Sequence, residues 1–423
     1  MVPKGWEETK LIDTSAKEKY SFTGGPFGSD LKSSDYTDNG VRIIQLQNIG
    51  DGKFNNGYKI FTSEEKADEL SSCNIFPGEI ILSKMGDPVA RATIIPSHHK
   101  RYLMASDGIR LKVDESKYDT FFIHEVINAP HFRGIALSKS TGSTRKRIGL
   151  TDLKNITFHC PPLIEQQKIA KILTTWDKAI SNTERLIENS TQQKKALMQQ
   201  LLTGKKRLLD NEGKRFAGEW ESLTIGDVVE LFNGYAFKSS DALEKGYKWL
   251  KIANVGIGEI KWDNSSYLPE GYENEYNRFN LKVGDVVVAM TRPTLGNQLK
   301  IARLKNKDDE SLLNQRVAKL LFSEKVSSEY MYQLLSTIGV ALKLNHALLG
   351  TDPPNLSTKV LHEISMELPP LIEQQKIATV LTNADKEIEL LEQQLADLQQ
   401  EKKALMQVLL TGKKRVVVDG EIA

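Results

Sequence analysis

Residues 161–170 read PPLIEQQKIA, and residues 369–378 read PPLIEQQKIA again. The match resumes as KKALMQ at 194 and 402, and as LLTGKKR at 201 and 409. All three blocks share one offset of 208 residues, so the two copies run for 47 residues without an insertion or a deletion. No other part of the chain is repeated so faithfully, which indicates that the two copies form its framework.

Each copy also carries a heptad, in which residues spaced alternately four and three apart form the seam of a supercoiled helix. In the first copy the seam is Ile169, Leu173, Trp176, Ile180, Thr183, Ile187, Ser190, Lys194, Leu197 and Leu201. In the second copy it is Ile377, Leu381, Ala384, Ile388, Leu391, Leu395, Leu398, Lys402, Leu405 and Leu409. At a rise of 1.5 Å per residue, each seam predicts a rod of roughly 48 Å.

The ends of both helices are marked by their sequence. A Pro-Pro pair suits the start of each helix, and Glu165 and Glu373 fall in the first turn, where the helix dipole is positive. Gly204 and Gly412 can take the left-handed conformation that ends a helix, and Lys-Lys-Arg follows each glycine where the dipole is negative.

The connection between the copies favours an antiparallel pair. The first rod ends near Lys206, and a linker of about ten residues, 208–217, leads into a domain that ends where the second rod begins. Both of these rod ends should therefore lie beside the same domain. A parallel pair would require that domain to bridge the whole length of a rod.

Composition limits the class of protein. The chain has 423 residues, enough for two or three domains, and its apolar content of 39% is ordinary for a soluble protein. The sequence has no apolar run long enough for a membrane span and no leader-like N-terminus. Cys73 and Cys160 are isolated, so neither a disulfide framework nor a metal site is expected, and a cytoplasmic location is the simplest interpretation.

Two mixed α/β domains are expected outside the rods. In the first, the predicted strands are 41–49, 79–84, 92–95, 108–113 and 155–160, and a helix is predicted over 118–139 with an interruption at Pro130. The second follows the same plan loosely. Trp6 corresponds to Trp220, Asn48-Ile49-Gly50 to Asn254-Val255-Gly256, Gly78-Glu79 to Gly284-Asp285, and Ile156 to Ile364.

The offsets of these corresponding residues vary from 206 to 214, unlike the constant offset of the rods. The framework has therefore been kept while the two domains have diverged. That pattern suits a framework that meets identical partners and carries two domains that each read something different.

Three stretches without Asp or Glu indicate a polyanionic ligand. They cover residues 88–106, 126–151 and 286–307, in a chain whose Lys plus Arg total of 57 barely exceeds its Asp plus Glu total of 55. The 142–147 loop, GSTRKR, can place guanidinium groups on phosphates or guanine edges. The candidate DNA-binding residues are Lys84, Arg91, Lys100, Arg101, Thr144, Arg145, Lys146, Arg147, Arg292, Thr294, Asn297, Gln298, Lys300 and Asn355.

Motifs of DNA-modifying enzymes are incomplete. Residues 352–355 read DPPN, which lacks the aromatic ring of an amino-methyltransferase box, and residues 256–258 read GIG without the third glycine of a methyl-donor loop. That GIG and the corresponding GDG at 50–52 are expected to be turns between strands. The acid-x-Lys of residues 64–66 lacks the preceding Pro-Asp of a nuclease, and the His residues show no metal spacing. No catalytic residue and no metal ligand are expected in this chain.

The duplicated PPLIEQQKIA helix, ending each time in LLTGKKR, resembles the specificity subunit of Type I restriction-modification systems. This resemblance covers the full chain. It implies an α+β fold in which two mixed α/β target-recognition domains are separated by two long antiparallel heptad helices, with an internal pseudo-twofold repeat. The expected segments are a first recognition domain (1–160), a spacer helix (161–207), a linker (208–217), a second recognition domain (218–368), a second spacer helix (369–415) and a tail (416–423).

The resemblance also implies partners. Each recognition domain would read one half of a bipartite site in double-stranded DNA, and the helices would set the length of the unread spacer. Two methyltransferase subunits and the restriction or translocase subunits would dock on the framework. S-adenosylmethionine, ATP and magnesium would then belong to those partners and not to this chain.

Two other classes of function remain open from the residues alone. One is a fused adenine methyltransferase or nuclease with its own active site, for which DPPN is the best feature. The other is a coiled-coil dimeriser whose domains bind protein and not DNA. Methyl transfer by the isolated chain would support the first, and failure of DNA to compete with a protein ligand would support the second.

Overall fold

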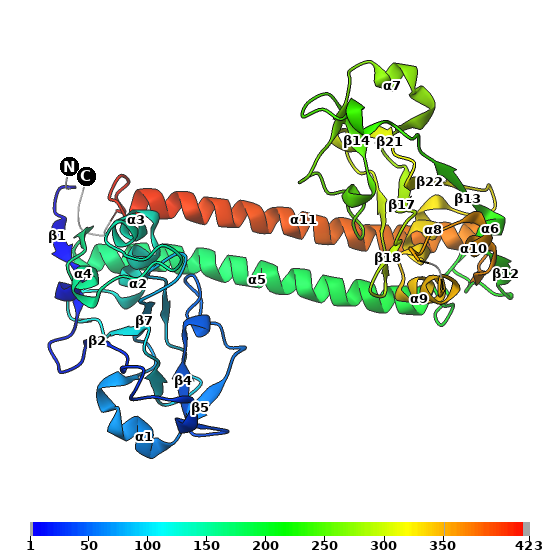
Figure 1. The fold of residues 1–423 in the computed structure, drawn as a ribbon. Coiled ribbons are helices and arrows are strands. Elements are labelled where there is room, and N and C mark those ends of the chain that lie inside the picture. Colours follow the sequence, from blue (N-terminus) through cyan, green and yellow to red (C-terminus); the bar gives the residue numbers. More distant parts are fainter. Residues whose placement is uncertain (1–2, 351, 418–423) are drawn as a thin grey trace. The chain divides into compact units, whose positions relative to one another are not determined.

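The computed structural model describes residues 3–350 and 352–417, so residues 418–423 of the expected tail lie outside the described part. The chain divides into two compact units. Unit 1 comprises Met1–Glu184 with Gln393–Ala423, and unit 2 comprises Arg185–Glu392. Each unit contains one mixed α/β domain and one half of each long helix (Figure 1). The mixed α/β class expected from the sequence is confirmed.

Unit 1 is built on three small sheets, in the strand orders β3-β5-β4-β9-β6, β2-β10-β7-β8 and β1-β11. The strands are β1 (Glu7–Lys10), β2 (Phe22–Gly24), β3 (Tyr36–Thr37), β4 (Val41–Ile44), β5 (Ile60–Thr62), β6 (Asn74–Ile75), β7 (Ile80–Ser83), β8 (Ala92–Ile94), β9 (Tyr102–Met104), β10 (Gly108–Leu111) and β11 (Thr157–Cys160). The helices of its domain are α1 (Glu64–Glu69), α2 (Thr120–Asn128), α3 (Pro130–Ser138) and α4 (Leu150–Lys154).

Unit 2 repeats this plan in the strand orders β15-β14-β21-β16, β13-β22-β17-β20 and β12-β23, and adds the hairpin β18-β19. The strands are β12 (Glu221–Thr224), β13 (Val229–Asn233), β14 (Tyr247–Leu250), β15 (Tyr267–Leu268), β16 (Asn280–Leu281), β17 (Val286–Ala289), β18 (Thr294–Leu295), β19 (Gln298–Leu299), β20 (Ile301–Arg303), β21 (Ser311–Leu313), β22 (Val317–Phe322) and β23 (Ser365–Leu368). The helices are α6 (Ile225–Val228), α7 (Tyr272–Glu275), α8 (Ser328–Leu335), α9 (Ile338–Ala347) and α10 (Thr358–His362).

The predicted strand over 41–49 is too long. β4 ends at Ile44, and Leu46–Asn48 form a short 3-10 helix. The buried side chain of Asn48 causes this change, because its Oδ1 accepts a hydrogen bond from the Gln45 N–H at 3.0 Å and closes the turn. The corresponding Asn254 accepts from the Lys251 N–H at 2.9 Å, so the predicted correspondence between these asparagines is confirmed.

Other local expectations also agree with the structure. The predicted 118–139 helix is interrupted as expected, with α3 beginning at Pro130, where the missing N–H costs nothing. The GDG and GIG sequences are turns, because isolated bridges pair Ile49 with Phe54 and Val255 with Ile260.

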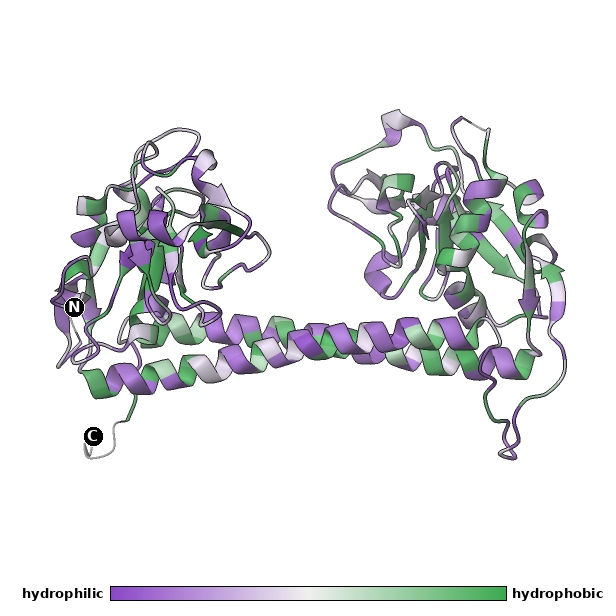
Figure 2. Ribbon diagram, turned by 90° about the horizontal axis from the view of Figure 1, so that it is seen from below, coloured by the Kyte–Doolittle hydropathy of each residue, from purple (hydrophilic) through white to green (hydrophobic). Residues whose placement is uncertain are grey.

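The two duplicated segments form helices of 39 residues, α5 (Leu163–Leu201) and α11 (Leu371–Leu409). Gly204 and Gly412 follow them with positive φ angles of 69° and 68°, as a left-handed helix end requires. None of the seam residues is exposed, and green and purple residues alternate along both helices (Figure 2). No helix in the described ranges 3–350 and 352–417 combines the length and apolar character needed to cross a membrane.

Ion pairs show how the two helices pack within each unit. In unit 1, Arg415 contacts Glu165 and Lys402 contacts Asp177. In unit 2, Arg207 contacts Glu373 and Lys194 contacts Asp385. As the residue number rises on one helix it falls on the other, so the helix segments are antiparallel in each unit.

The start of each long helix is held by a buried carboxylate. In unit 1, Arg415 donates two hydrogen bonds of 2.7 Å to Glu165, and the Trp6 Nε1–H donates a third at 3.2 Å. In unit 2, Arg207 donates to Glu373 at 2.7 and 2.6 Å. The glutamate of one sequence copy is therefore neutralised by the closing arginine of the other copy.

The hydrophobic core of each domain includes the helix ends. In unit 1 it contains Ile169 and Leu173 of α5 together with Leu409 of α11. In unit 2 it contains Leu201 of α5 and Ile377 of α11, among others. The domain and the helix ends therefore form one hydrophobic core in each unit. Full burial of such a side chain contributes about 1.5–3 kcal/mol to the stability of the unit.

Candidate nucleic-acid interface

Two loops converge in unit 1, and we name them together loop pair 1. The first loop, residues 84–91, follows β7, and the second, residues 141–148, precedes α4. Met85 and Arg147 form an isolated β-bridge, and the Gly86 N–H donates to the Lys146 carbonyl at 3.1 Å. Ile148 N–H donates to the Lys84 carbonyl at 3.0 Å. Sequence candidates from two distant segments are thus brought together.

The charged side chains of loop pair 1 differ in their exposure. Thr144, Arg145 and Lys146 are exposed. Arg147 is 52% exposed and pairs with Asp107 at 2.8 Å. Burial lowers the pKa of Lys84, as does the nearby charge of Arg147 to a smaller extent. The outer loop therefore offers cations to a ligand, while Lys84 lies deeper and donates to the Ser106 carbonyl at 3.4 Å.

Unit 2 has the same arrangement, which we name loop pair 2. It joins residues 290–300, after β17, to residues 352–357, before α10. Thr291 and Asn355 form an isolated β-bridge, and the Arg292 N–H donates to the Pro354 carbonyl at 2.8 Å. The side chains of Arg292 and Asn355 are exposed. The DPPN sequence at 352–355 is thus part of a loop that is hydrogen-bonded to the loop following β17.

The hairpin β18-β19 projects from loop pair 2. Asn297 and Gln298 are exposed at its turn. The Thr294 hydroxyl donates to Asn345 Oδ1. Lys300 is half-buried and donates to the Ile252 carbonyl at 3.3 Å, and burial lowers its pKa. Of these predicted residues, Asn297 and Gln298 are the most accessible to a ligand.

The remaining candidates of unit 1 have other contacts. Arg101 pairs with Asp68 at 2.5 Å and also with Glu64, both on α1, so its charge is already neutralised. Lys100, beside it, is exposed. Arg91 is half-buried, and its Nη2 lies 3.3 Å from the position of a Cβ built on Gly86. Arg91 therefore packs within the first loop of loop pair 1, beside Gly86, while Arg101 is bound to α1.

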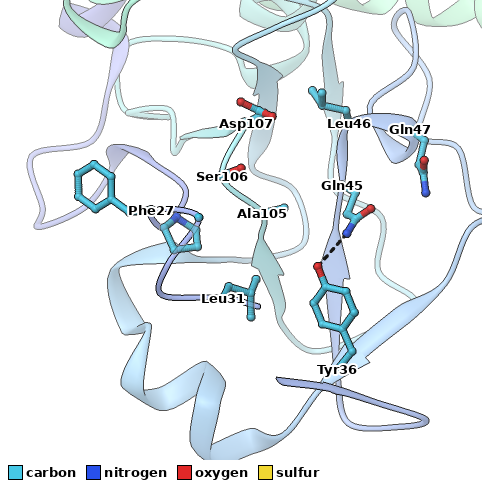
Figure 3. Close-up of a pocket in the computed structure, with 11 residues that line it drawn as sticks. Phe27, Leu31, Tyr36, Gln45, Leu46, Gln47, Ala105, Ser106 and Asp107 are labelled. Atoms are coloured by element: carbon cyan, nitrogen blue, oxygen red, sulfur yellow. Dashed lines mark hydrogen bonds between the residues drawn. The ribbon is translucent and has the colours of Figure 1, made fainter. Parts of the chain in front are cut away.

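Unit 1 contains a cavity of about 340 Å³ (Figure 3), and one of its lining residues, Asp107, pairs with Arg147 of loop pair 1. It is lined by Pro26, Phe27, Gly28, Leu31, Tyr36, Gln45, Leu46, Gln47, Ala105, Ser106 and Asp107. Gln45 donates to the Tyr36 hydroxyl at 3.1 Å, and Phe27, which also lines the cavity, is 82% exposed. Amides, a carboxylate and an aromatic ring thus lie beside the basic loop.

The charge pattern of the sequence could not reveal this cavity, because its polar groups are neutral or acidic. The GGPFG sequence at 24–28 was the available signal, since an aromatic residue between glycines suits an exposed loop. Arg316 was missed for a similar reason: it lies outside the acid-free stretches, yet its carbonyl accepts from the Met290 N–H at 2.9 Å and places it beside loop pair 2.

The family described as the Type I restriction modification DNA specificity domain matches residues 30–190 and 217–400. This chain belongs to the Type I restriction-modification specificity subunits. It is 34% identical to the MjaVIII specificity subunit of Methanocaldococcus jannaschii, over 80% of this chain and 77% of that one. As a specificity subunit, it supplies the DNA sequence specificity of such a system, and the two matched regions contain the two loop pairs.

Solved structures agree with this fold. The specificity subunit has a TM-score of 0.58 with the S subunit of a Type I system from M. genitalium, at 16% identity, over 97% of this chain and 99% of that one. A chain from a structure of the assembly of a Type I system gives a TM-score of 0.52 at 13% identity, over 98% of this chain and 100% of that one. At these identities the likeness concerns the fold alone.

Proposed function

We propose that this specificity subunit reads a bipartite target in double-stranded DNA, one half-site with each domain, and that it is a non-catalytic scaffold for the other subunits. The observation that carries the proposal is the contrast between the repeats. The helix junctions use the same residues twice, whereas loop pair 1 presents the sequence GSTRKR and loop pair 2 presents a polar hairpin and DPPN. One framework thus holds two different reading surfaces.

The proposed organisation keeps the segments expected from the sequence: recognition domains 1–160 and 218–368, spacer helices 161–207 and 369–415, a linker at 208–217 and a tail at 416–423. The ion pairs that join the helices occur in pairs separated by 208 residues on both partners, as in Lys194–Asp385 and Lys402–Asp177. This supports an internal pseudo-twofold axis between α5 and α11. The helices would then set the spacer between half-sites.

The methyltransferase subunits are proposed to dock at the helix starts. Ile164 and Ile372 are equivalent and are 64% and 60% exposed. Leu209 and Val417 are equivalent as well, and their carbonyls accept hydrogen bonds from the equivalent Lys376 and Lys168. An exposed apolar patch that occurs twice suits two copies of one partner.

The same proposal assigns the chemistry to the partners. The methyltransferase subunits would bind S-adenosylmethionine, and the restriction subunits would bind ATP and magnesium. The complex would act on cytoplasmic DNA. None of these groups is assigned to residues of this chain.

Footprinting tests the proposal. The chain purified with its methyltransferase subunits should protect two short DNA segments separated by an accessible spacer, and the methylated adenines should fall in the two segments. One contiguous footprint would contradict two-domain reading. Methyl transfer to DNA by the isolated chain would instead support the fused-enzyme alternative.

A charge variant tests loop pair 1. Replacing Arg145 and Lys146 with Ala should weaken binding to all sequences and reduce the slope of log K against log salt by about 0.9 for each phosphate that is no longer neutralised. Lys245, an exposed residue of unit 2 that precedes β14 in a different sheet from β17, provides a control as Lys245→Ala. An unchanged salt slope would remove the 142–147 loop from the interface.

A further inference from the structure

Two turns occupy the same place in the two domains. One joins β9 to β10 and the other joins β21 to β22. Lys84, the first residue after β7, donates its N–H to the Asp107 carbonyl at 2.7 Å. Met290, the first residue after β17, donates its N–H to the Arg316 carbonyl at 2.9 Å. Asp107 and Arg316 are therefore equivalent residues.

The chemistry of these residues is opposite. The Asp107 carboxylate is 20% exposed, pairs with Arg147, and lines the cavity that also contains Gln45 and Gln47 (Figure 3). Arg316 is exposed, and in the part of the chain that the structure describes its guanidinium forms no ion pair. The backbone of each residue is hydrogen-bonded to the first residue of the loop pair of its own unit.

A carboxylate in this place indicates which part of DNA the turn meets. The Asp107 carboxylate carries only acceptor atoms and has no hydrogen bond to donate to a phosphate, even while Arg147 offsets its charge, whereas in the major groove the amino groups of cytosine and adenine donate to such an acceptor. The turn should therefore face base edges, with the outer Arg145 and Lys146 on the backbone. An arginine in the equivalent place is suited to donate two hydrogen bonds to O6 and N7 of guanine.

We propose that Asp107 and Arg316 determine sequence specificity, each in one half-site. Asp107 accepts a hydrogen bond from the amino group of a cytosine or an adenine, and Arg316 recognises a guanine. This inference rests on the proposed bipartite function and names the base edges that each domain selects. It also explains how two domains with one backbone plan select different half-sites.

The test uses the specificity subunit assembled with its methyltransferase subunits. The wild-type target is first obtained from the methylated adenines, and binding is then measured to duplexes that carry each single base-pair substitution. Arg316→Ala should lose preference at one guanine of one half-site by about 10- to 100-fold, and Arg316→Lys should keep part of it. Asp107→Ala should lose preference at one position of the other half-site. Lys245→Ala should leave both half-sites unchanged.

The possible outcomes separate the hypotheses. If Arg316→Ala weakens binding to every duplex equally and lowers the salt slope, Arg316 contacts phosphate and the inference is wrong. If Asp107→Ala and Arg147→Ala lose preference at the same position, Asp107 only positions Arg147 and its proposed contact is wrong. If the wild-type complex shows no bipartite target, the proposed function itself fails. If Arg316→Ala and Asp107→Ala both keep the base preferences of the wild type, only the inference about these two residues is wrong.

Discussion

At the scale of single residues, two seam lysines occupy equivalent places and differ in what they neutralise. Lys402 contacts Asp177 at 2.8 Å and the buried Glu125 at 3.1 Å. Lys194 contacts Asp385, which also accepts a hydrogen bond of 2.7 Å from Gln333. Gln333 is the residue equivalent to Glu125, so the charge balance differs between the two units at this place.

Replacing Lys402 with Met should leave the buried Glu125 with His124 as its remaining partner and without the lysine cation, at a cost of about 3–5 kcal/mol in the free energy of unfolding. The matched variant Lys194→Met should cost roughly 1 kcal/mol, because it leaves only the part-exposed Asp385 and a neutral amide. Urea unfolding followed separately in each unit by hydrogen exchange measures both values. Equal losses in the two units would show that Glu125 does not depend on Lys402.

The same contrast gives a pH dependence. Burial favours a higher pKa for Glu125, but the hydrogen bond from His124 and the charges of His124 and Lys402 outweigh it, so its pKa lies below the ordinary 4.5. The stabilising contribution of Glu125 is therefore present above pH 4.5 and is lost as the pH falls through the lowered value. The variant Glu125→Gln should flatten this acid-side loss in unit 1, which thermal unfolding at several pH values would measure. If Glu125→Gln loses stability at acid pH as steeply as the wild type, Glu125 is not the group responsible for that loss.

Contacts between residues far apart in the sequence could not be predicted from local patterns. The seam position of Lys402 could be predicted, but its partners Glu125 and Asp177 could not, since only the fold brings them together. Likewise, charge alone indicated the 142–147 loop, whereas Asp107 and Arg316 are neighbours of the loop pairs through backbone hydrogen bonds that no local pattern reveals.

At the scale of elements, both long helices begin at a buried glutamate whose partners differ slightly. Glu165 is bound by Arg415 and by Trp6, whereas the corresponding Nε1 of Trp220 is buried without a partner among the described residues. Glu373 thus depends more heavily on its arginine. The repeated PPLIEQQ and TGKKR sequences consequently have a structural reason to remain identical, besides the partner contacts expected from the sequence.

Removing these arginines should loosen the helix starts unequally. Arg207→Ala should cost about 3 kcal/mol, and Arg415→Ala roughly 2 kcal/mol, because Arg415 is more exposed and Trp6 still binds Glu165. Lysine at either position should restore only part of the loss, since it lacks the bidentate geometry. Hydrogen exchange in the first turns of α5 and α11 measures the effect, and a larger loss for Arg415→Ala would contradict this order.

Long helices and short strands differ in how well the sequence predicts them. The helices α5 and α11 were predictable because heptad, Pro-Pro start and glycine end agree over a long segment. Strands of two residues, such as β3 and β6, carry no alternation long enough to read. Their positions depend on pairing with β5 and β9, which lie in other parts of the sequence.

At the scale of the whole molecule, the proposed role of the helices as a ruler depends on register. Lys402–Asp177 fixes the pairing of α5 with α11 in unit 1, and Lys194–Asp385 fixes it in unit 2. An insertion in one helix alone cannot satisfy both ion pairs. A matched insertion of one heptad in each helix, after Glu188 and after Leu390, preserves both pairs and the seam.

The matched insertion lengthens each helix by about 10.5 Å, which corresponds to about three base pairs of B-DNA. The assembled methyltransferase should therefore prefer a spacer longer by about three base pairs, while the two half-site sequences stay the same, because the loop pairs are untouched. Sequencing of methylated adenines in cells that express the variant measures spacer and half-sites together. The single insertion after Glu188 serves as a control that should reduce methylation at every spacer. An unchanged spacer in the matched variant would mean that α5 and α11 do not set the distance between half-sites.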